Sequence, residues 1–375
     1  MRPPIRANIL KVSPYLPGKP IEEVQRELGL TNVVKLASNE NPLGPSPKAI
    51  HAVQDAANRM NVYPDGLAFT LKAAISKKFN VEPDQIMLGN GSDELIHLLA
   101  FLFLESENDQ VIMATPGFAR YMSAALLAPS KLIQVPLNSN MVHDLPAMAK
   151  KLSNHTKLVF IANPHNPTGT IITKTDFDHF LSDLPPKATV VLDEAYAEFA
   201  ADQPDFPNSL HYVLEGKPVV GLRTFSKSYG LAGIRIGYGF AHPDIVDAYH
   251  RAREPFNVNL LAQTAAVAAL SDESFLNDSI RHNSYGVKRL TEFFASQGCH
   301  PYPSFANFVL VDAHRPATKV FKELLAEGVI VRDATSFGLP NCIRVSVGTG
   351  DEMDAFEQAF LRVLSGNVVT RGVIK

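Results

Sequence analysis

Six short, almost wholly apolar runs recur between residues 86 and 222, and they constrain the fold more than any other feature of the chain. They span residues 86–88, 110–114, 131–135, 158–162, 189–192 and 219–222. Segments with a helical spacing of apolar residues, such as 177–184, separate most of them. Strands that alternate with helices form βαβ units, whose sheet is mostly parallel and covered by helices. The sequence therefore predicts an α/β fold whose large domain has a mostly parallel sheet flanked by helices.

The remaining residues predict an N-terminal arm and a smaller α+β domain. The arm carries a helix at 21–28 that ends at Gly29. A helix over 258–270 is expected to lead into the second domain, which has strands at 307–311, 329–331 and 342–347 and helices at 316–327 and 351–364. We expect residues 1–46 to form the arm and part of the small domain, 47–272 the large domain, and 273–375 the small C-terminal domain.

Composition excludes several classes of protein. Lys and Arg number 35 and Asp and Glu 38, so the net charge of −3 disfavours a nucleic-acid partner. The longest apolar run, 95–104, is shorter than the ~20 residues of a membrane helix, which favours a buried helix. Cys299 and Cys342 form neither a disulfide framework nor a zinc motif, and the N-terminus lacks a secretion signal. We expect a cytoplasmic protein with no metal and no membrane contact.

Polar residues follow four of the predicted strands, at 89–94, 163–169, 193–196 and 223–230. Ligands of a parallel sheet bind outside the carboxyl ends of its strands. Gly91 permits close backbone approach, and Ser92 can cap a helix whose first N–H groups face an anion. Arg235 could grip the same anion through two nitrogens. These residues predict a phosphate site.

Two further residues predict covalent chemistry beside that phosphate site. Lys227 lies between Ser226 and Ser228, where burial would favour its neutral, nucleophilic amine. Asp193 ends a buried strand, and a buried carboxylate needs a cationic partner. Each feature alone fits a turn, a solvated lysine or a capping residue. Together they supply a Schiff-base lysine, a pyridinium partner and a phosphate cradle, the protein groups that pyridoxal phosphate requires.

These motifs resemble the fold-type-I pyridoxal-phosphate aminotransferases. The resemblance rests on Asn166-Pro-Thr-Gly169, Asp193-x-x-Tyr196, Ser226-Lys227 and Arg235. It implies that Lys227 forms the Schiff base with the cofactor and later carries the proton. It also implies that Asp193 keeps the pyridine nitrogen protonated, and that Asn166 and Tyr196 bind the phenolic oxygen of the ring.

The same resemblance assigns the remaining cofactor contacts. The cofactor phosphate would be surrounded by several polar residues, partly through backbone N–H groups: Gly91, Ser92, Asp93, Thr224, Ser226 and Arg235. Phe118 matches the aromatic residue that stacks on the pyridine ring. Tyr63 matches a tyrosine that reaches the cofactor phosphate of the neighbouring subunit, which implies a homodimer.

Further motifs narrow the resemblance to the histidinol-phosphate aminotransferase family. They are found at residues 13–23, at 36–47, and in 331–333 followed by 343–349. In that family Arg344 matches the general substrate-anion arginine, and Arg332 matches an arginine that helps bind the substrate phosphate. Tyr15 would close over the substrate from the arm, and Asn39 and Tyr63 are further substrate-binding candidates.

The reaction implied is transfer of an amino group between histidinol phosphate and 2-oxoglutarate, with ping-pong kinetics and glutamate as the other product. An aromatic-amino-acid aminotransferase, or an enzyme with both specificities, remains open because Phe337 favours an aromatic ring. A threonine-phosphate decarboxylase-like lyase is a third reading. A non-enzymatic, cofactor-sensing transcription regulator is disfavoured, since no basic DNA-binding domain precedes the first strand of the sheet.

Overall fold

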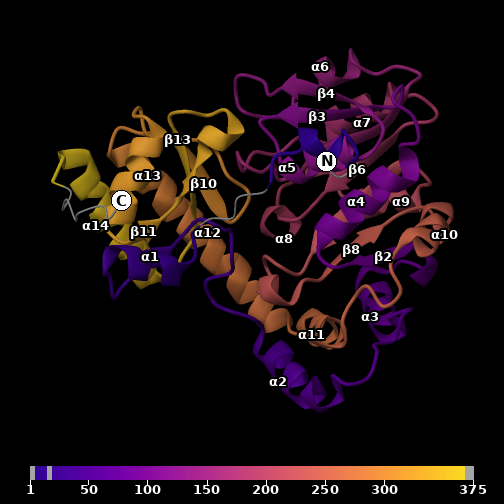
Figure 1. Cartoon of the computed structure of the whole chain (residues 1–375), viewed down its shortest axis with the longest axis horizontal. Helices are drawn as coiled ribbons and strands as arrows, with labels where there is room; N and C mark the ends of the chain where they lie inside the picture. Colours follow the sequence, from indigo (N-terminus) through magenta and orange to yellow (C-terminus); the bar gives the residue numbers. More distant parts are fainter. Residues whose placement is uncertain (1–4, 15–18, 368–375) are drawn as a thin grey trace.

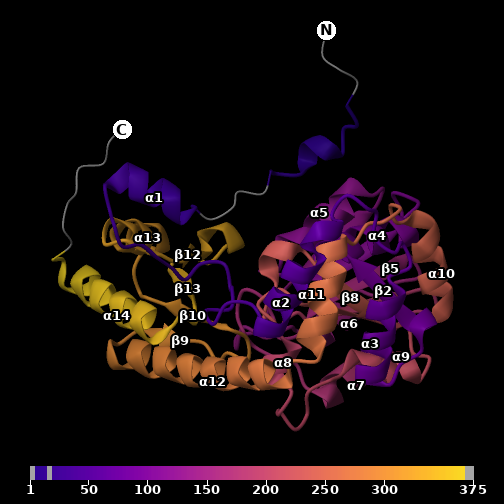
Figure 2. The same ribbon diagram turned by 90° about the horizontal axis from the view of Figure 1, so that it is seen from below.

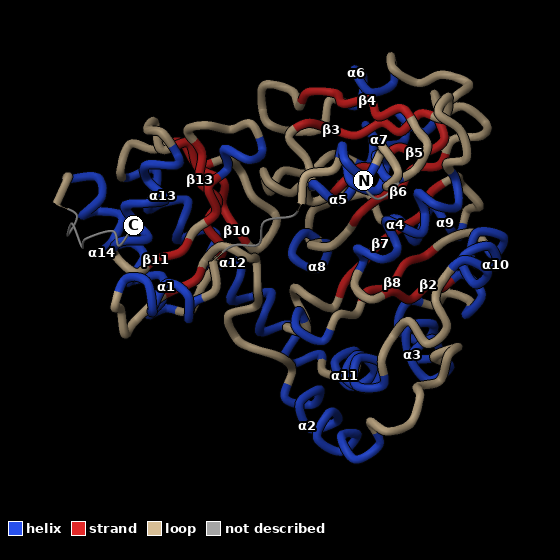
Figure 3. The backbone as a smooth tube through the Cα atoms, in the orientation of Figure 1, coloured by secondary structure: helices blue, strands red, loops and turns tan. Residues whose placement is uncertain are grey.

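A seven-stranded sheet forms the centre of the larger part of the molecule (Figures 1 and 3). The computed structural model describes residues 5–14 and 19–367. The strand order is β2 (Ile86–Gly89), β8 (Gly237–Phe240), β7 (Val219–Thr224), β6 (Thr189–Asp193), β5 (Thr156–Ala162), β3 (Gln110–Thr115) and β4 (Lys131–Pro136). All six runs predicted as strands are strands, and β7, β6, β5, β3 and β4 are mutually parallel. The predicted α/β class is confirmed.

The sequence did not reveal β8, which lies antiparallel between β2 and β7. Its four residues include two glycines, so it lacks the continuous apolar pattern of the other strands. Gly237 is needed here, because a Cβ atom at this position would lie 2.4 Å from the backbone nitrogen of Ser92. This close contact lets the N-terminus of α4 (Ser92–Phe103), the helix that follows β2, lie against β8.

Helices cover both faces of this sheet, because alternate strand residues point to opposite sides. One face packs against α4 (Ser92–Phe103), α5 (Ala119–Leu127) and α10 (Pro243–Ala252). The other packs against α6 (Leu145–Ala149), α7 (Lys174–Ser182) and α9 (Ser209–Leu214). Near β2 and β8, a third apolar cluster joins α2 (Pro47–Ala56), α3 (Phe69–Phe79) and α11 (Leu260–Leu270). The segment predicted as a helix at 258–270 is thus α11, within the larger part.

The long helix α12 (Glu273–Ser296) connects the larger part to the smaller one, as Figure 2 shows. The smaller part has a four-stranded antiparallel sheet in the order β12 (Arg332–Asp333), β13 (Cys342–Ser346), β10 (Phe308–Asp312) and β9 (His300–Pro301). β1 (Val34–Lys35) pairs in parallel with β11 (Val329–Ile330). The helices around these strands are α1 (Ile21–Leu28), α13 (Ala317–Ala326) and α14 (Gly350–Ser365).

Segments of the N-terminal arm contact both parts. The buried Val24 of α1 packs on Ile330 of the smaller part. The 3-10 turn η1 (Ile9–Lys11) lies on the larger part, where the Asn8 side chain donates to the carbonyl oxygens of Leu126 and Leu127 at the end of α5. The domain boundaries at 46/47 and 272/273 stay a prediction. Among the described residues, no helix is both long enough and apolar enough to cross a membrane.

Candidate active site

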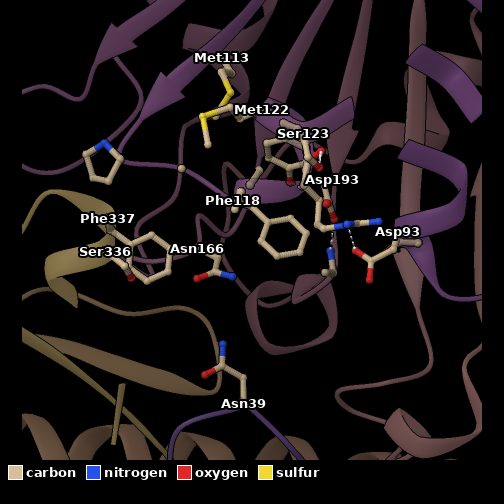
Figure 4. Close-up of a pocket in the computed structure, with 18 of the residues that line it drawn as sticks. Asn39, Asp93, Met113, Phe118, Met122, Ser123, Asn166, Asp193, Ser336 and Phe337 are labelled. Carbon is tan, nitrogen blue, oxygen red and sulfur yellow. Dashed lines mark hydrogen bonds and ion pairs between the residues drawn. The ribbon is translucent and has the colours of Figure 1, made fainter. Parts of the chain in front are cut away.

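A cavity of about 920 Å³ lies beside the carboxyl ends of β3, β5, β6 and β7, facing the smaller part (Figure 4). Most of the predicted site residues line it: Asn39, Ser92, Asp93, Phe118, Asn166, Asp193, Tyr196, Thr224, Ser226, Lys227, Arg235, Arg332 and Arg344. They come from segments more than 300 residues apart in the chain. The fold therefore brings together the residues that the motifs singled out.

Lys227 follows β7 and is partly buried in this cavity. Its Nζ donates to the carbonyl oxygen of Ser38 at 3.4 Å and lies 5.7 Å from the centre of the Tyr196 ring. Burial, followed by the positive charge of Arg344, lowers the pKa of Lys227 to about 8. A sizeable fraction of the amine is consequently neutral near physiological pH, as a nucleophile or proton acceptor must be.

Asp193 ends β6 and is almost fully buried. The hydroxyl of Tyr121 donates to its Oδ2 at 2.6 Å, and the backbone N–H of Ala195 donates to its Oδ1 at 3.1 Å. Burial raises the pKa of Asp193 to about 6. Within the described ranges no ion pair joins it to a basic side chain, so a cationic group placed in the cavity would stabilise its charged form.

Tyr196 and Asn166 face the same cavity and are fixed by neighbours. The hydroxyl oxygen of Tyr196 accepts a hydrogen bond from Asn39 Nδ2 at 2.9 Å, which leaves its own proton for a further acceptor. Asn166 Oδ1 accepts from Arg344 Nη1 at 2.5 Å, leaving its amide nitrogen to donate. In Figure 4, Phe118 lies between Asn166 on one side and Asp193 on the other. This arrangement suits a flat ring that carries an oxygen substituent.

Asn39 is held from both parts of the molecule. Its backbone has a positive φ of 53°, and its backbone N–H donates to Ser346 Oγ at 2.9 Å. Ser346 Oγ in turn donates to Asn39 Oδ1, while Asn307 Nδ2 donates to the Asn39 carbonyl oxygen at 3.0 Å. Because Oδ1 is occupied by Ser346, Nδ2 is directed at Tyr196. Asn39 thus orients Tyr196 in addition to lining the cavity itself.

The end of the site that the sequence predicts to bind a phosphate is built from the start of α4 and from Arg235. Gly91 has a φ of 78°, and a Cβ atom there would lie 2.5 Å from Arg235 Nη2, so only glycine leaves room for the guanidinium. The first N–H groups of α4 have no partner within the helix and favour an anion. Thr224 and Ser226 add two buried hydroxyl groups. This end suits a phosphate.

The two arginines of the smaller part lie directly opposite each other in the β12–β13 ladder. Arg344 is buried, donates from Nη2 to the carbonyl oxygen of Ala37 at 3.0 Å, and lies 4.9 Å from the centre of the Phe308 ring. Arg332 lies 5.7 Å from the centre of the Phe337 ring and 3.5 Å from Ser336 Oγ. Both side chains reach the cavity.

The alternative interpretation of Arg332 is a surface ion pair with Asp333 or Glu323. Neither ion pair forms. The side chain of Asp333 instead accepts from the backbone N–H of Thr335 at 2.8 Å, and Glu323 faces Lys319 at 3.8 Å. Arg332 makes no ion pair with any carboxylate in the part of the chain that the structure describes. Its charge remains available to a ligand in the cavity.

Of the predicted residues that the structure describes, Gly91 and Tyr63 do not line this cavity. Tyr63 is 79% exposed and stacks on Phe256 with ring centres 4.8 Å apart. Tyr15 lies outside the described residues, although its neighbours Ser13 and Pro14 line the cavity. No group of three His, Cys, Asp or Glu in residues 5–14 and 19–367 is placed to hold a metal ion.

Sequence reasoning missed several side chains that line the site. Tyr121 was missed although it lies three positions after Phe118, on the same face of the first turn of α5. Arg120 lies between them and also lines the cavity. Met113 and Met122 form an apolar end, opposite Asn39 in the view of Figure 4. A search for charged and aromatic residues around the matched Phe118 would have found Tyr121 and Arg120.

Comparison with known proteins gives consistent matches along the chain. Residues 31–360 match the family model described as aminotransferase class I and II. A histidinol-phosphate aminotransferase of Moorella thermoacetica is 48% identical over 364 residues, which cover 97% of this chain and 94% of that protein. The corresponding protein of Brevibacillus brevis is 42% identical, with coverage of 96% and 98%. The crystal structure of histidinol-phosphate aminotransferase from Sinorhizobium meliloti in complex with pyridoxal-5'-phosphate has a TM-score of 0.88 at 28% identity, covering 98% of this chain and 99% of that one.

Proposed function

The chain belongs to the class I and II aminotransferases, and we propose that it interconverts histidinol phosphate and 2-oxoglutarate with imidazole-acetol phosphate and glutamate. Its cofactor is pyridoxal phosphate. The observation that carries the substrate proposal is the pair formed by Arg332 and Arg344, opposite each other on β12 and β13 and facing the cavity. Two guanidinium groups can hold a phosphate dianion through charge-assisted hydrogen bonds.

The cavity residues fit the cofactor. The buried Asp193 would pair with the protonated ring nitrogen, Tyr196 and Asn166 would donate to the phenolic oxygen, and Arg235 with the start of α4 would hold the phosphate. Bound pyridoxal phosphate supplies a carbonyl carbon that takes up the amino group and a ring that withdraws electrons from the substrate. Phe118 would cover one face of this ring.

Lys227 carries out the proton movement. With its pKa lowered to about 8, its Nζ would take up the proton that the substrate Cα gives up and would later give that proton back. Asp193 would remain charged with a cation against it, and would in that state hold a proton on the ring nitrogen. The aromatic Phe337 and the apolar Met113 and Met122 exclude water around the substrate side chain.

One pair of arginines can serve both substrates of this exchange. Histidinol phosphate has a phosphate but no α-carboxylate, whereas glutamate has two carboxylates. Arg344 would bind an anionic group of either substrate, and Arg332 would be needed most by the phosphate. Tyr15 would complete the substrate site from the arm.

We further propose a homodimer in which Tyr63 reaches the cofactor phosphate of the second copy. Phe256, on which Tyr63 stacks, is exposed in the single chain, and so are the large apolar residues near Tyr63 in the sequence: Met60, Val62, Leu67 and Phe69. Monomers rarely expose contiguous apolar patches of this kind. Analytical ultracentrifugation of the wild-type protein and of Tyr63→Ala tests the assembly, and a monomeric wild-type enzyme with full activity would refute it.

A cytoplasmic location is part of the same proposal. Cys299 and Cys342 are both free thiols in the structure, as suits a reducing compartment. Cell fractionation with an antibody to the chain tests this placement.

The substrate test compares kcat/KM for histidinol phosphate and for phenylalanine, each with 2-oxoglutarate, on cofactor-loaded protein. We expect a preference of at least about 100-fold for histidinol phosphate, because phenylalanine lacks the phosphate that Arg332 would bind. A preference for phenylalanine would overturn the substrate proposal and leave the aminotransferase chemistry intact. Release of carbon dioxide from an amino-acid substrate would identify a lyase instead.

A further inference from the structure

Asp93 lies between two arginines that approach it from different elements. Arg235 Nη2 is 3.3 Å from Asp93 Oδ2, and Arg120 Nε is 3.6 Å from Asp93 Oδ1. Each arginine therefore faces its own carboxylate oxygen. Figure 4 shows Asp93 at the edge of the cavity, on the same side as Asp193.

The position of Asp93 creates an electrostatic difficulty for the cofactor. Asp93 is the second residue of α4, directly after Ser92, so its charge lies at the helix end that would bind the cofactor phosphate. A carboxylate repels a phosphate dianion at short range. If Asp93 paired with Arg235 alone, the two charges would cancel and the phosphate would meet only neutral donors.

Arg120 changes this balance because it adds a second positive charge to the same carboxylate. It belongs to the first turn of α5, between Phe118 and Tyr121, and its side chain is one-third exposed. Its Nε is buried and has no hydrogen-bond acceptor among residues 5–14 and 19–367. Asp93 is the one carboxylate with which it forms an ion pair in those ranges.

We propose that Arg120 is a positioning residue for the cofactor phosphate, which neutralises Asp93 and so leaves the charge of Arg235 available to the phosphate. The group formed by Arg120, Asp93 and Arg235 carries a net charge of +1. Arg120 acts through Asp93 and Arg235, without contacting the phosphate itself. The inference rests on the pyridoxal phosphate site alone and does not depend on the identity of the amino donor.

A double-mutant cycle on the cofactor-free full-length protein tests this role. Dissociation constants for inorganic phosphate and for pyridoxal phosphate are measured by titration calorimetry for wild type, Arg120→Met, Asp93→Asn and the double variant. We expect Arg120→Met to weaken binding of both ligands about fivefold. In the Asp93→Asn background the same change should cost about twofold or less, because no carboxylate remains to be neutralised.

Two control variants separate positioning from a structural effect. Arg120→Lys keeps the charge and should recover most of the affinity. Arg251→Met removes an exposed arginine that pairs with Asp247 on α10, outside the site, and should leave phosphate binding unchanged. An equal loss for Arg120→Met with and without Asp93 would overturn the proposal, and so would an Arg120→Lys variant as weak as Arg120→Met. Neither readout involves histidinol phosphate, so failure here is distinct from failure of the substrate proposal.

Discussion

The two walls of the cavity are built differently. The cofactor wall carries Asp193, Tyr196 and Asn166 of the larger part, and the substrate wall carries Arg332 and Arg344 of the smaller part. On the wall that fits the cofactor, the key polar side chains follow strands of the seven-stranded sheet, and a neighbour holds each of them: Tyr121 bonds Asp193, Asn39 bonds Tyr196, and Arg344 bonds Asn166. On the substrate wall, Arg332 begins a two-residue strand, and its hydrogen bond to Ser336 is 3.5 Å long. We infer that the residues proposed for the chemistry common to all substrates are held in place before binding, whereas the residue proposed to recognise one substrate has fewer restraints.

The arginines of β12 and β13 show the same difference at neighbouring positions. Arg344 is enclosed between Asn166, the Ala37 carbonyl and the Phe308 ring. Arg332 has an aromatic neighbour in Phe337 and is more exposed than Arg344. We infer that Arg344 serves every substrate and that Arg332 determines which substrate is preferred.

The largest effect is expected on the cofactor wall, from Lys227→Ala. Loss of the amine removes both the covalent attachment and the proton carrier, so turnover should fall by at least about 10³-fold. The protein should remain folded, since Lys227 makes one long hydrogen bond. Activity assays with a thermal melt as the folding control check this. Substantial turnover in the variant would contradict the mechanism.

Asp193→Asn tests the same wall with a smaller effect. Removing the buried charge should weaken pyridoxal phosphate binding by about 100-fold. In the wild type the pKa of Asp193 is about 6, so protonation should weaken binding as the pH falls through this value. The asparagine variant should lack this step. The phosphate titrates in both proteins, so the difference between their two profiles isolates Asp193, and identical profiles would exclude it as the pyridinium partner.

The substrate wall should respond selectively to Arg332→Ala. We expect kcat/KM for histidinol phosphate to fall by about 10- to 100-fold, and that for phenylalanine to change by about threefold or less. Arg344→Ala is the matched control and should impair both substrates. Equal losses on both substrates in the Arg332 variant would remove the distinction between the two arginines.

The smallest expected effect is a pH dependence of the free energy of unfolding, caused by a buried histidine near the cofactor wall. His143 and His165 are buried, with ring centres 4.5 Å apart, and His165 directly precedes Asn166. Burial lowers the pKa of His143 to about 4. The unfolded chain therefore takes up a proton on His143 at a higher pH than the folded protein does. As a result, the free energy of unfolding decreases as the pH falls from about 6.5 towards 4.

Lowering the pH from 7.5 to 5 should reduce the free energy of unfolding by about 2 kcal/mol through His143 alone. Urea unfolding of wild type and of His143→Gln at both pH values measures it. The glutamine variant keeps a donor for the Ala162 carbonyl but cannot titrate. Parallel losses in the two proteins would show that other groups cause the acid sensitivity.

Much of the large sheet could be predicted because its strands are buried on both faces. Val111, Ile112, Val159 and Val190 leave no polar gap in their runs, so period and length both indicate strands. β8 could not be found in this way, since its pairing depends on glycines that permit close contact and carry no apolar signal. The sequence pattern also did not predict the 24-residue helix α12, because polar residues interrupt its apolar face.

The site was predictable where a motif fixes both residue type and spacing, as for Lys227, Asp193 and Arg235. It was not predictable where a side chain acts through a neighbour. Tyr121 and Arg120 look like ordinary residues of an amphipathic helix until the fold places Asp193 and Asp93 beside them. Such contacts depend on tertiary distances that no local pattern encodes.

Asn39 links the two parts of the molecule through its hydrogen bonds. Its backbone is bonded to Ser346 and Asn307 of the smaller part, and its side chain to Tyr196 of the larger part. A rotation of the small sheet away from the large one must stretch or break at least one of these hydrogen bonds. Opening of the cavity and loss of the Tyr196 orientation are therefore linked equilibria, so a ligand that favours the closed arrangement also favours the oriented hydroxyl.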